Sequence, residues 1–152
     1  MRKVLILLGS KSDEAAMAGC TEYLVRFGIP HDLRISSAHR QPEETAALVK
    51  SAEQNGYAII IAAAGMAAHL PGLAAAYTTL PVIGVPLEGS ALHGVDALYS
   101  IVQMPAGIPV ATVAIGPAGA KNAAVLAAEI LALDNDGLRQ KLRDFRSNGA
   151  KF

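Results

Sequence analysis

Short apolar runs alternate with amphipathic segments from one end of the chain to the other. Most of the runs lack polar residues at every second position, and this pattern predicts strands that are covered on both faces. We expect these strands at Val4–Leu8, His31–Ile35, Ala58–Ala63, Val82–Val85 and Val110–Ile115.

The segments between the runs have apolar residues at helical spacing and signals for helix ends. The first runs from about residue 14 to Phe27 and is closed by Gly28. The second begins at Pro42, has acidic residues in its first turn and ends at Asn55-Gly56. Further helices are expected from Pro71, over residues 91–99 and 120–133, and over about residues 137–147, the last being short and amphipathic.

The regular alternation of strands and helices predicts an α/β fold. Parallel strands joined by right-handed crossovers give a three-layer α/β/α sandwich, and we expect one domain over residues 1–152. Five parallel strands suit the flavodoxin-like order 2-1-3-4-5. Such sheets bind ligands outside the carboxyl ends of their strands, near the point where the strand order reverses.

The composition indicates that the chain buries part of its surface against other subunits. Hydrophobic residues make up 52% and charged residues 17%, against roughly 25% charged in an average soluble chain, and the mean hydropathy is +0.34. There is too little polar surface here to cover a monomer of this size, so we expect a homo-oligomer.

Charge, hydropathy and the cysteine count argue against nucleic-acid binding, membrane insertion and an internal disulfide. The net charge is zero, and the basic cluster in residues 139–146 is short, so no nucleic acid is expected. No stretch approaches the roughly 18 apolar residues that span a bilayer, and the apolar run after Lys3 is too short for a signal peptide. The single Cys20 cannot form an internal disulfide, and we expect it in the core of a cytoplasmic protein.

The loop after the first strand reads Gly9-Ser10-Lys11-Ser12-Asp13. Gly9 permits a tight turn, and hydroxyls beside free amides at a helix start are suited to oxyanions. Asp13 is placed to accept hydrogen bonds from ribose hydroxyls. The same residues also fit a simple helix cap made by Ser12 or Asp13, and the loop alone does not decide between the two interpretations.

The loops after the second and third strands carry further candidates. Ser37, His39 and Arg40 set a hydroxyl, an imidazole and a guanidinium just before the helix that starts at Pro42. The third loop is made of small residues and ends at a second histidine; Ala64, Gly65, His69 and Leu70 are its candidate binding residues. The alternative interpretation of the second loop is an exposed histidine without a function. That of the third loop is that its small residues only let the next helix pack closely on the sheet.

In the predicted strand order the three loops lie at one edge of the sheet. The polar side chains of all three then share one cleft, which would bind a phosphorylated sugar beside an acid/base histidine, His39. The segment Glu88-Gly89-Ser90 follows the fourth strand, and His93 comes soon after. These residues could rim the same cleft or that of a neighbouring subunit, but we favour a solvated loop. No cluster of side chains has the spacing of metal ligands, so no metal is expected.

The motifs GSKSD, SAHRQP and AAHLPG, followed by PVIGVP and YSIVQMPAGIPV, resemble in content and order those of the class I N5-carboxyaminoimidazole ribonucleotide mutase family. The resemblance covers about residues 4–131. It implies a flavodoxin-like subunit in a homo-octamer that works in purine biosynthesis without metal or organic cofactor. The implied reaction moves a carboxyl group from the exocyclic nitrogen to carbon 4 of aminoimidazole ribonucleotide, through trapped carbon dioxide.

The resemblance also implies roles for individual residues. The GSKSD loop, with Gly9, Ser10, Ser12 and Asp13, would hold phosphate and ribose. Arg40 would bind phosphate, Ser37 would orient the ligand and His39 would transfer protons. The third loop, over residues 63–69, would confine carbon dioxide.

Two positions depart from the family pattern, which has glycine where this chain has Ala63 and Met66. Ala63 adds only a methyl group. Met66 is bulky and ill suited to positive φ. We therefore expect either that its side chain points away from the pocket or that it narrows the pocket.

Three alternatives remain at this point. Within the family, a class II carboxylase takes free carbon dioxide and aminoimidazole ribonucleotide directly. The fold also suits a flavin-binding electron carrier or a signalling receiver, which are not enzymes of this kind. A receiver needs acidic residues where this chain has Leu8-Gly9 and Ala63-Ala64, and the candidate loops contain no aromatic residue on which a flavin would stack.

Overall fold

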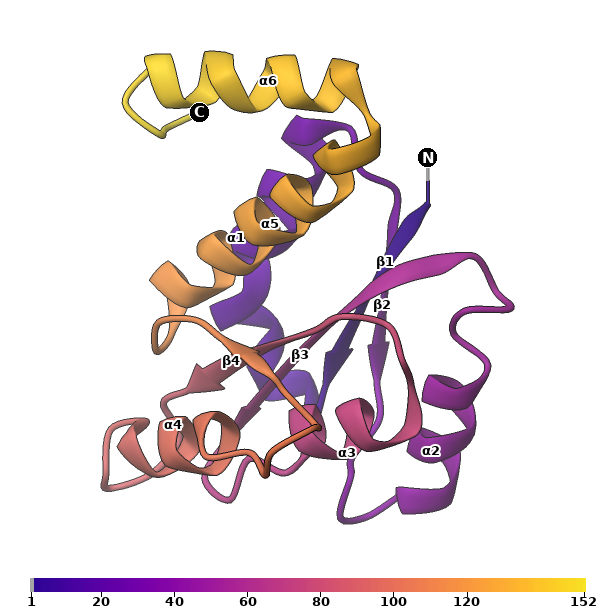
Figure 1. The fold of residues 1–152 in the computed structure, drawn as a ribbon. Helices are drawn as coiled ribbons and strands as arrows, with labels where there is room; N and C mark the ends of the chain where they lie inside the picture. The colour runs from indigo at the N-terminus through magenta and orange to yellow at the C-terminus, as the bar shows by residue number, and fades with distance from the viewer. Residues whose placement is uncertain (1) are drawn as a thin grey trace.

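A five-stranded parallel sheet forms the middle of the computed structural model, which describes residues 2–152 (Figure 1). The strands are β1 (Lys3–Leu8), β2 (His31–Ile35), β3 (Tyr57–Gly65), β4 (Val82–Leu87) and β5 (Ala111–Thr112). Their order is β2-β1-β3-β4-β5, and every neighbouring pair is parallel. The predicted fold class and strand order are confirmed.

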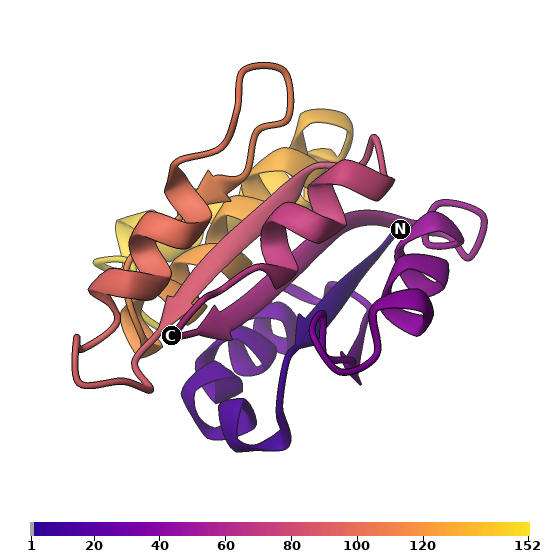
Figure 2. The same ribbon diagram turned by 90° about the horizontal axis from the view of Figure 1, so that it is seen from below.

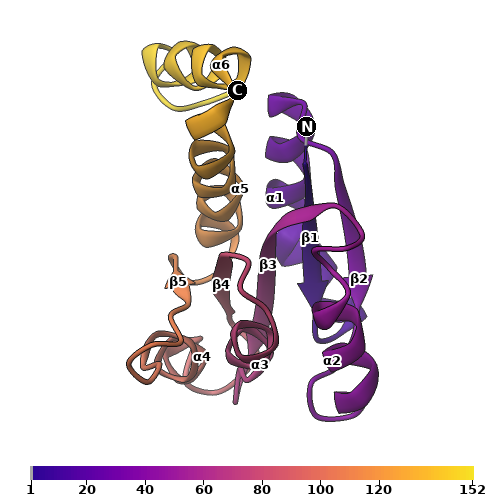
Figure 3. The same ribbon diagram turned by 45° about the vertical axis from the view of Figure 1, so that its right-hand side comes forward.

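Helices cover both faces of the sheet (Figures 1 and 3). One layer contains α1 (Glu14–Phe27), α5 (Pro117–Leu131) and α6 (Asp136–Ser147); the other contains α2 (Pro42–Lys50), α3 (Leu70–Tyr77) and α4 (Val95–Val102). Figure 2 shows the helices of the second layer in front of the sheet. Successive residues of a strand point to opposite layers. Val4 and Ile6 pack towards α1 and α5, whereas Leu5 and Leu7 pack towards α2 and α3.

Small residues bring α1 and α5 close together. The buried face of α5 consists of glycine and alanine, including Ala123 and Ala127, and it packs against the buried Cys20 and Leu24 of α1. Alanine has little side chain to keep two helix axes apart. Burial raises the pKa of the Cys20 thiol to about 12, so this residue belongs to the core, as expected, and is not a nucleophile.

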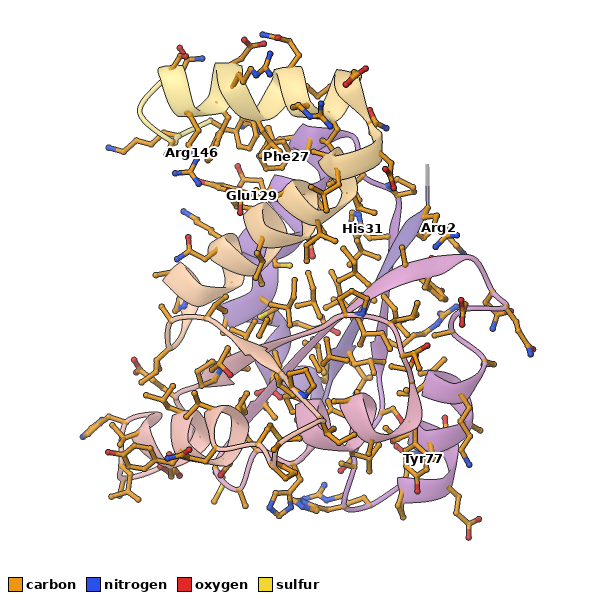
Figure 4. The ribbon with its side chains drawn as sticks, viewed as in Figure 1. Arg2, Phe27, His31, Tyr77, Glu129 and Arg146 are labelled. Atoms are coloured by element: carbon orange, nitrogen blue, oxygen red, sulfur yellow. The ribbon has the colours of Figure 1, made fainter. Side chains whose placement is uncertain are left out.

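The helix α6 lies across the ends of α1 and α5, joined to α5 by the short 3₁₀ helix Ala132–Asp134. Asn135 caps α6 by accepting a hydrogen bond from the Leu138 amide at 2.9 Å. Figure 4 shows Arg146 facing Glu129, and the two side chains form an ion pair of 2.8 Å. The Phe27 and Phe145 rings meet edge to face beneath α6, with centroids 5.3 Å apart.

The last strand is much shorter than predicted. We expected Val110–Ile115, but only Ala111 and Thr112 pair with β4. The carbonyls of Gly84 and Pro86 both face the incoming chain, because they accept hydrogen bonds from the Val113 and Gly116 amides. The missing N–H of Pro86 therefore falls on this same side of β4, and the regular ladder ends there.

Three helices also differ from their predicted bounds, and the fifth runs over Pro117–Leu131 instead of residues 120–133. The fourth begins at Val95 instead of residue 91, because His93 and Gly94 have φ of 52° and 84°, which no right-handed helix contains. The second ends at Lys50 and continues to Gly56 as turns. No helix within residues 2–152 has the length and apolar character needed to cross a bilayer.

Candidate active site

The carboxyl ends of four strands lie level with one another. Leu8 at the end of β1 is paired with Ile35 on one side and Ala63 on the other, and Gly65 is paired with Leu87. The loops that follow these strands therefore leave the sheet at one edge. Between them is a cleft of about 510 Å³.

Every residue that the sequence assigned to the site lies in this cleft. Its walls are formed by Gly9, Ser10, Ser12, Asp13, Ser37, Ala38, His39, Arg40, Ala64, Gly65, Met66, Ala67, His69, Leu70, Glu88 and Gly89. None of these is a Phe, Tyr or Trp, so the cleft gives a flavin ring no aromatic side chain of that kind on which to stack.

In the first loop, a cap and a polar cleft wall are made by the same residues. The Ser10 hydroxyl accepts a hydrogen bond from the Ser12 amide at 3.3 Å and lies 2.9 Å from the Ser12 hydroxyl. It caps the short 3₁₀ helix Lys11–Asp13 that leads into α1. Both hydroxyls remain exposed to the cleft, where they are free to bind an oxyanion.

Asp13 is a carboxylate held partly away from water. Its Oδ2 would lie 4.0 Å from a Cβ placed on Gly9, so the side chain turns back over the start of the loop. Burial raises the pKa of the Asp13 carboxyl, and the backbone of Ser10 only partly offsets this effect. None of the salt bridges within residues 2–152 includes Asp13.

A buried hydroxyl pair supports the second loop. Ser36 and Thr45 are both buried, and their hydroxyl oxygens are 2.6 Å apart. Thr45 also donates to the Gln41 carbonyl at 2.8 Å, and the Gln41 amide donates to the Ser37 carbonyl at 2.8 Å. The loop is thus fixed at both ends, while the side chains of His39 and Arg40 remain exposed to the cleft.

Thr45 was not among the residues predicted from the sequence. The sequence could have indicated this residue, because Thr45 places a hydroxyl on the face of α2 that also carries the buried Ala46 and Val49. A buried hydroxyl needs a hydrogen-bond partner, and here the partners are loop atoms beside His39.

The two histidines of the cleft contact each other. His39 Nε2 lies 2.6 Å from His69 Nδ1, and the rings meet edge to face with centroids 4.7 Å apart. Two N–H groups cannot face each other at this distance, so one nitrogen donates and the other accepts. The pair therefore carries at most one positive charge. A proton given up by one ring leaves that ring ready to accept another.

The third loop keeps a left-handed backbone at a residue that is not glycine. Met66 has a φ of 56°, its side chain is 59% exposed, and it lines the cleft. Met66 is thus an exposed part of the cleft wall. Ala63 is buried among core residues on the α1 and α5 side of the sheet, so its extra methyl group does not reach the cleft.

The fourth loop is solvated and also contributes to the cleft. Glu88 and Gly89 are exposed and line the cleft, which was the less favoured of our interpretations, whereas Ser90 and His93 do not line it. The signal was the position of Glu88 directly after β4, since β4 is the neighbour of β3 in the predicted order. Its Oε1 would lie 3.9 Å from a Cβ on Gly116, so the carboxylate is directed towards the start of α5.

The cleft carries side chains of both signs, Arg40 on one hand and Asp13 and Glu88 on the other. The first residues of α3 and of the 3₁₀ helix before α1 also line or border it, and backbone amides at a helix start lack helical partners and favour anions. Within residues 2–152, Arg40 is not a member of any salt bridge. Among these residues no group of three His, Cys, Asp or Glu side chains has a metal-binding arrangement.

Comparison with known proteins shows the same sequence pattern in characterised enzymes. A family model described as AIR carboxylase matches residues 3–151. The N5-carboxyaminoimidazole ribonucleotide mutase of Escherichia coli K12 is 56% identical over 144 residues, covering 95% of this chain and 85% of that protein. The mutase of Haemophilus influenzae is 53% identical over 146 residues, covering 96% and 89%.

Solved structures show a similar fold. The structure of Treponema denticola PurE has a TM-score of 0.87 and 31% sequence identity, and the match covers 97% of this chain and 90% of that one. A 3-dehydroquinate dehydratase-like protein from Bifidobacterium longum has a TM-score of 0.53 and 17% identity, which is a likeness of fold alone.

The partly buried Asp13 gives a prediction about stability. An acid whose pKa is raised by folding disfavours the folded state once pH rises through that pKa, and has no such effect below its ordinary pKa of about 3.9. Asp13→Asn removes the charge, so we expect a higher Tm near neutral pH. The gain should vanish in acid.

Calorimetry of the wild type and Asp13→Asn across this pH range measures the effect. Asp134→Asn is the matched control, because Asp134 is exposed and lies at the end of the 3₁₀ helix before α6. A Tm for Asp13→Asn that is equal to or below the wild-type value at neutral pH would contradict the burial argument.

Proposed function

Because this chain belongs to the AIR carboxylase family, we propose that it catalyses the reaction for which its mutase relatives are named. It moves the carboxyl group of N5-carboxyaminoimidazole ribonucleotide from the exocyclic nitrogen to carbon 4 of the imidazole, a step in purine biosynthesis. The observation that carries the proposal is the imidazole pair of 2.6 Å set among anion-binding loops in one cleft. No other part of residues 2–152 combines these features.

The ribonucleotide binds through its phosphate and ribose. Arg40 presents a guanidinium that matches two phosphate oxygens at once, and the Ser10 and Ser12 hydroxyls donate to the same group. Asp13 accepts hydrogen bonds from ribose hydroxyls, in addition to the backbone of Ser10. Ser37 is held beside the Arg40 amide at 3.2 Å and orients the ligand from the second loop.

The chemistry needs one group that gives a proton and later takes one. Cleavage of the bond between nitrogen and the carboxyl carbon releases carbon dioxide as a proton from His39 reaches the exocyclic nitrogen. Carbon 4 then forms its bond to the same carbon dioxide, and the proton on carbon 4 passes to the side chain of His39. Protons and electron pairs balance, because His39 ends as it began.

His69 supports this exchange by holding the ring of His39. The contact of 2.6 Å holds the Nε2 edge of the His39 imidazole and gives the ring a hydrogen-bond partner while the substrate reacts. The small side chains of Ala64, Gly65 and Ala67 let the imidazole of the substrate approach the loop closely and leave room for carbon dioxide.

The reaction of the isolated protein distinguishes the mutase from a carboxylase that takes free carbon dioxide. We expect full turnover of N5-carboxyaminoimidazole ribonucleotide in buffer depleted of carbon dioxide, with no increase on adding bicarbonate. Aminoimidazole ribonucleotide plus bicarbonate should give little product over the same period. Product formation that depends wholly on bicarbonate would refute the mutase assignment.

His39→Asn should abolish turnover while substrate still binds. Loss of an acid/base group lowers kcat by about 10²–10⁴-fold, whereas the phosphate and ribose contacts remain and the affinity stays nearly unchanged. Steady-state kinetics and calorimetric binding of the ribonucleotide measure the two effects separately. His31→Asn is the control, since His31 starts β2 and contacts the Ile29 carbonyl instead of the cleft. A near-normal kcat for His39→Asn would refute the assignment of His39 as the acid/base group.

We also propose that the chain acts as a cytoplasmic homo-octamer. The observation in favour of assembly is an apolar stripe on α4 and the turn before it, made of Leu92, Val95, Tyr99 and Val102, which are all exposed at helical spacing. Tyr99, for example, is 64% exposed. A free Cys20 fits the reducing cytoplasm.

Light scattering of the purified protein measures its oligomeric state. We expect eight times the subunit mass of 15.7 kDa. Tyr99→Asp should dissociate the assembly, because a carboxylate is costly in an apolar contact. Val25→Asp, at an isolated site on α1 that is also 64% exposed, should leave it intact. A wild-type protein that is monomeric at all concentrations would contradict the proposal.

A further inference from the structure

Met66 has a backbone conformation that suits glycine and a side chain that gains little from the fold. Three residues other than glycine have positive φ within residues 2–152, namely Met66, His93 and Ala150, and of these only Met66 lines the cleft. Its side chain is 59% exposed, so burial in the free protein does not explain why an unfavourable backbone carries a long apolar side chain.

The surrounding chain fixes this conformation. Gly65 is held in the sheet beside Leu87, and a Cβ there would lie 3.2 Å from the Leu87 carbonyl oxygen. Ala68 and Leu70 are buried on the other side of the loop. The backbone therefore has to turn sharply at residue 66, and glycine would do so without strain. Strain that persists beside a reacting centre points to a function for the side chain.

The cleft has room for that side chain opposite its own loop. Gly89 lies near Gly65, its Cα 3.9 Å from the position of a Cβ on Gly65, and no atom lies within 4 Å of a Cβ built on Gly89 itself. Methionine is unbranched and flexible and fills irregular apolar gaps. The other side chains of this loop before His69 are no larger than a methyl group, so Met66 has the only one there that is long enough to reach across the cleft.

We propose that Met66 covers the part of the cleft where carbon dioxide waits between its release and its recapture. The inference rests on the proposed function, in which carbon dioxide is set free beside Ala64 and Ala67 and has to stay until carbon 4 attacks it. The thioether side chain lies over the imidazole of the bound nucleotide and excludes water. Met66 is thus a positioning residue that decides how often the released carbon dioxide is kept.

Isotope retention tests this role without depending on the overall rate. The substrate carries ¹³C in its carbamate carbon, and the buffer contains unlabelled bicarbonate with carbonic anhydrase, so any carbon dioxide that escapes is diluted at once. Mass spectrometry of the carboxylated product, taken at early times, gives the fraction that keeps the label. A reaction without enzyme supplies the background from spontaneous decarboxylation.

We expect the wild type to keep nearly all of the label. Met66→Gly should raise the unlabelled fraction, or the yield of aminoimidazole ribonucleotide per product formed, by about threefold or more, whereas Met66→Leu should stay close to the wild type because it retains the apolar volume. The Tm of Met66→Gly should not fall, since glycine adopts this φ without strain. A loss of label would then not be due to unfolding.

The outcomes separate this inference from the proposed function. If Met66→Gly retains as much label as the wild type, the proposed role of Met66 is refuted, whereas the mutase reaction is not. A wild type that forms no carboxylated product from the labelled substrate would instead overturn the proposed function. Equal losses of label in Met66→Gly and Met66→Leu would also refute an apolar cover.

Discussion

The hydrogen-bond register of the central strands is the constraint on which the whole site depends. It sets Leu8 level with Ile35 and Ala63, and Gly65 level with Leu87, so four loops begin at one edge of the sheet. A slip of one residue would move a strand end by about 3.3 Å and turn its side chains to the opposite layer. The two buried faces prevent such a slip, because each alternate residue already has its own apolar neighbours.

Much of this arrangement follows from local sequence. The apolar runs of β1 and β3 and the end signals at Gly28 and Pro42 are local features, and the alternation of elements then leads to the strand order. The three loops were predicted to share a cleft because parallel strands share an edge. The same reasoning, applied to β4, favours Glu88 as a cleft residue over a purely solvated one.

Other features depend on contacts between distant segments and were not predictable in this way. The length of β5 depends on which side of β4 the missing N–H of Pro86 faces. The start of α4 depends on left-handed backbone at His93 and Gly94. The contact between His39 and His69 joins side chains 30 positions apart, and no periodicity along the chain encodes a distance of 2.6 Å. Fold class needs only patterns, whereas site geometry needs coordinates.

The short β5 has a consequence for the behaviour of the protein at high concentration. An open sheet invites another chain to pair with its outer strands, and long, flat, apolar edges are the usual starting points of aggregation. Here one edge offers only Ala111 and Thr112 in regular pairing, with Pro109 just before them, and the other edge, β2, carries the charged Asp32 and Arg34. Neither edge is a good template for a foreign strand. A chain with so apolar a composition thus keeps its backbone hydrogen bonds within its own fold.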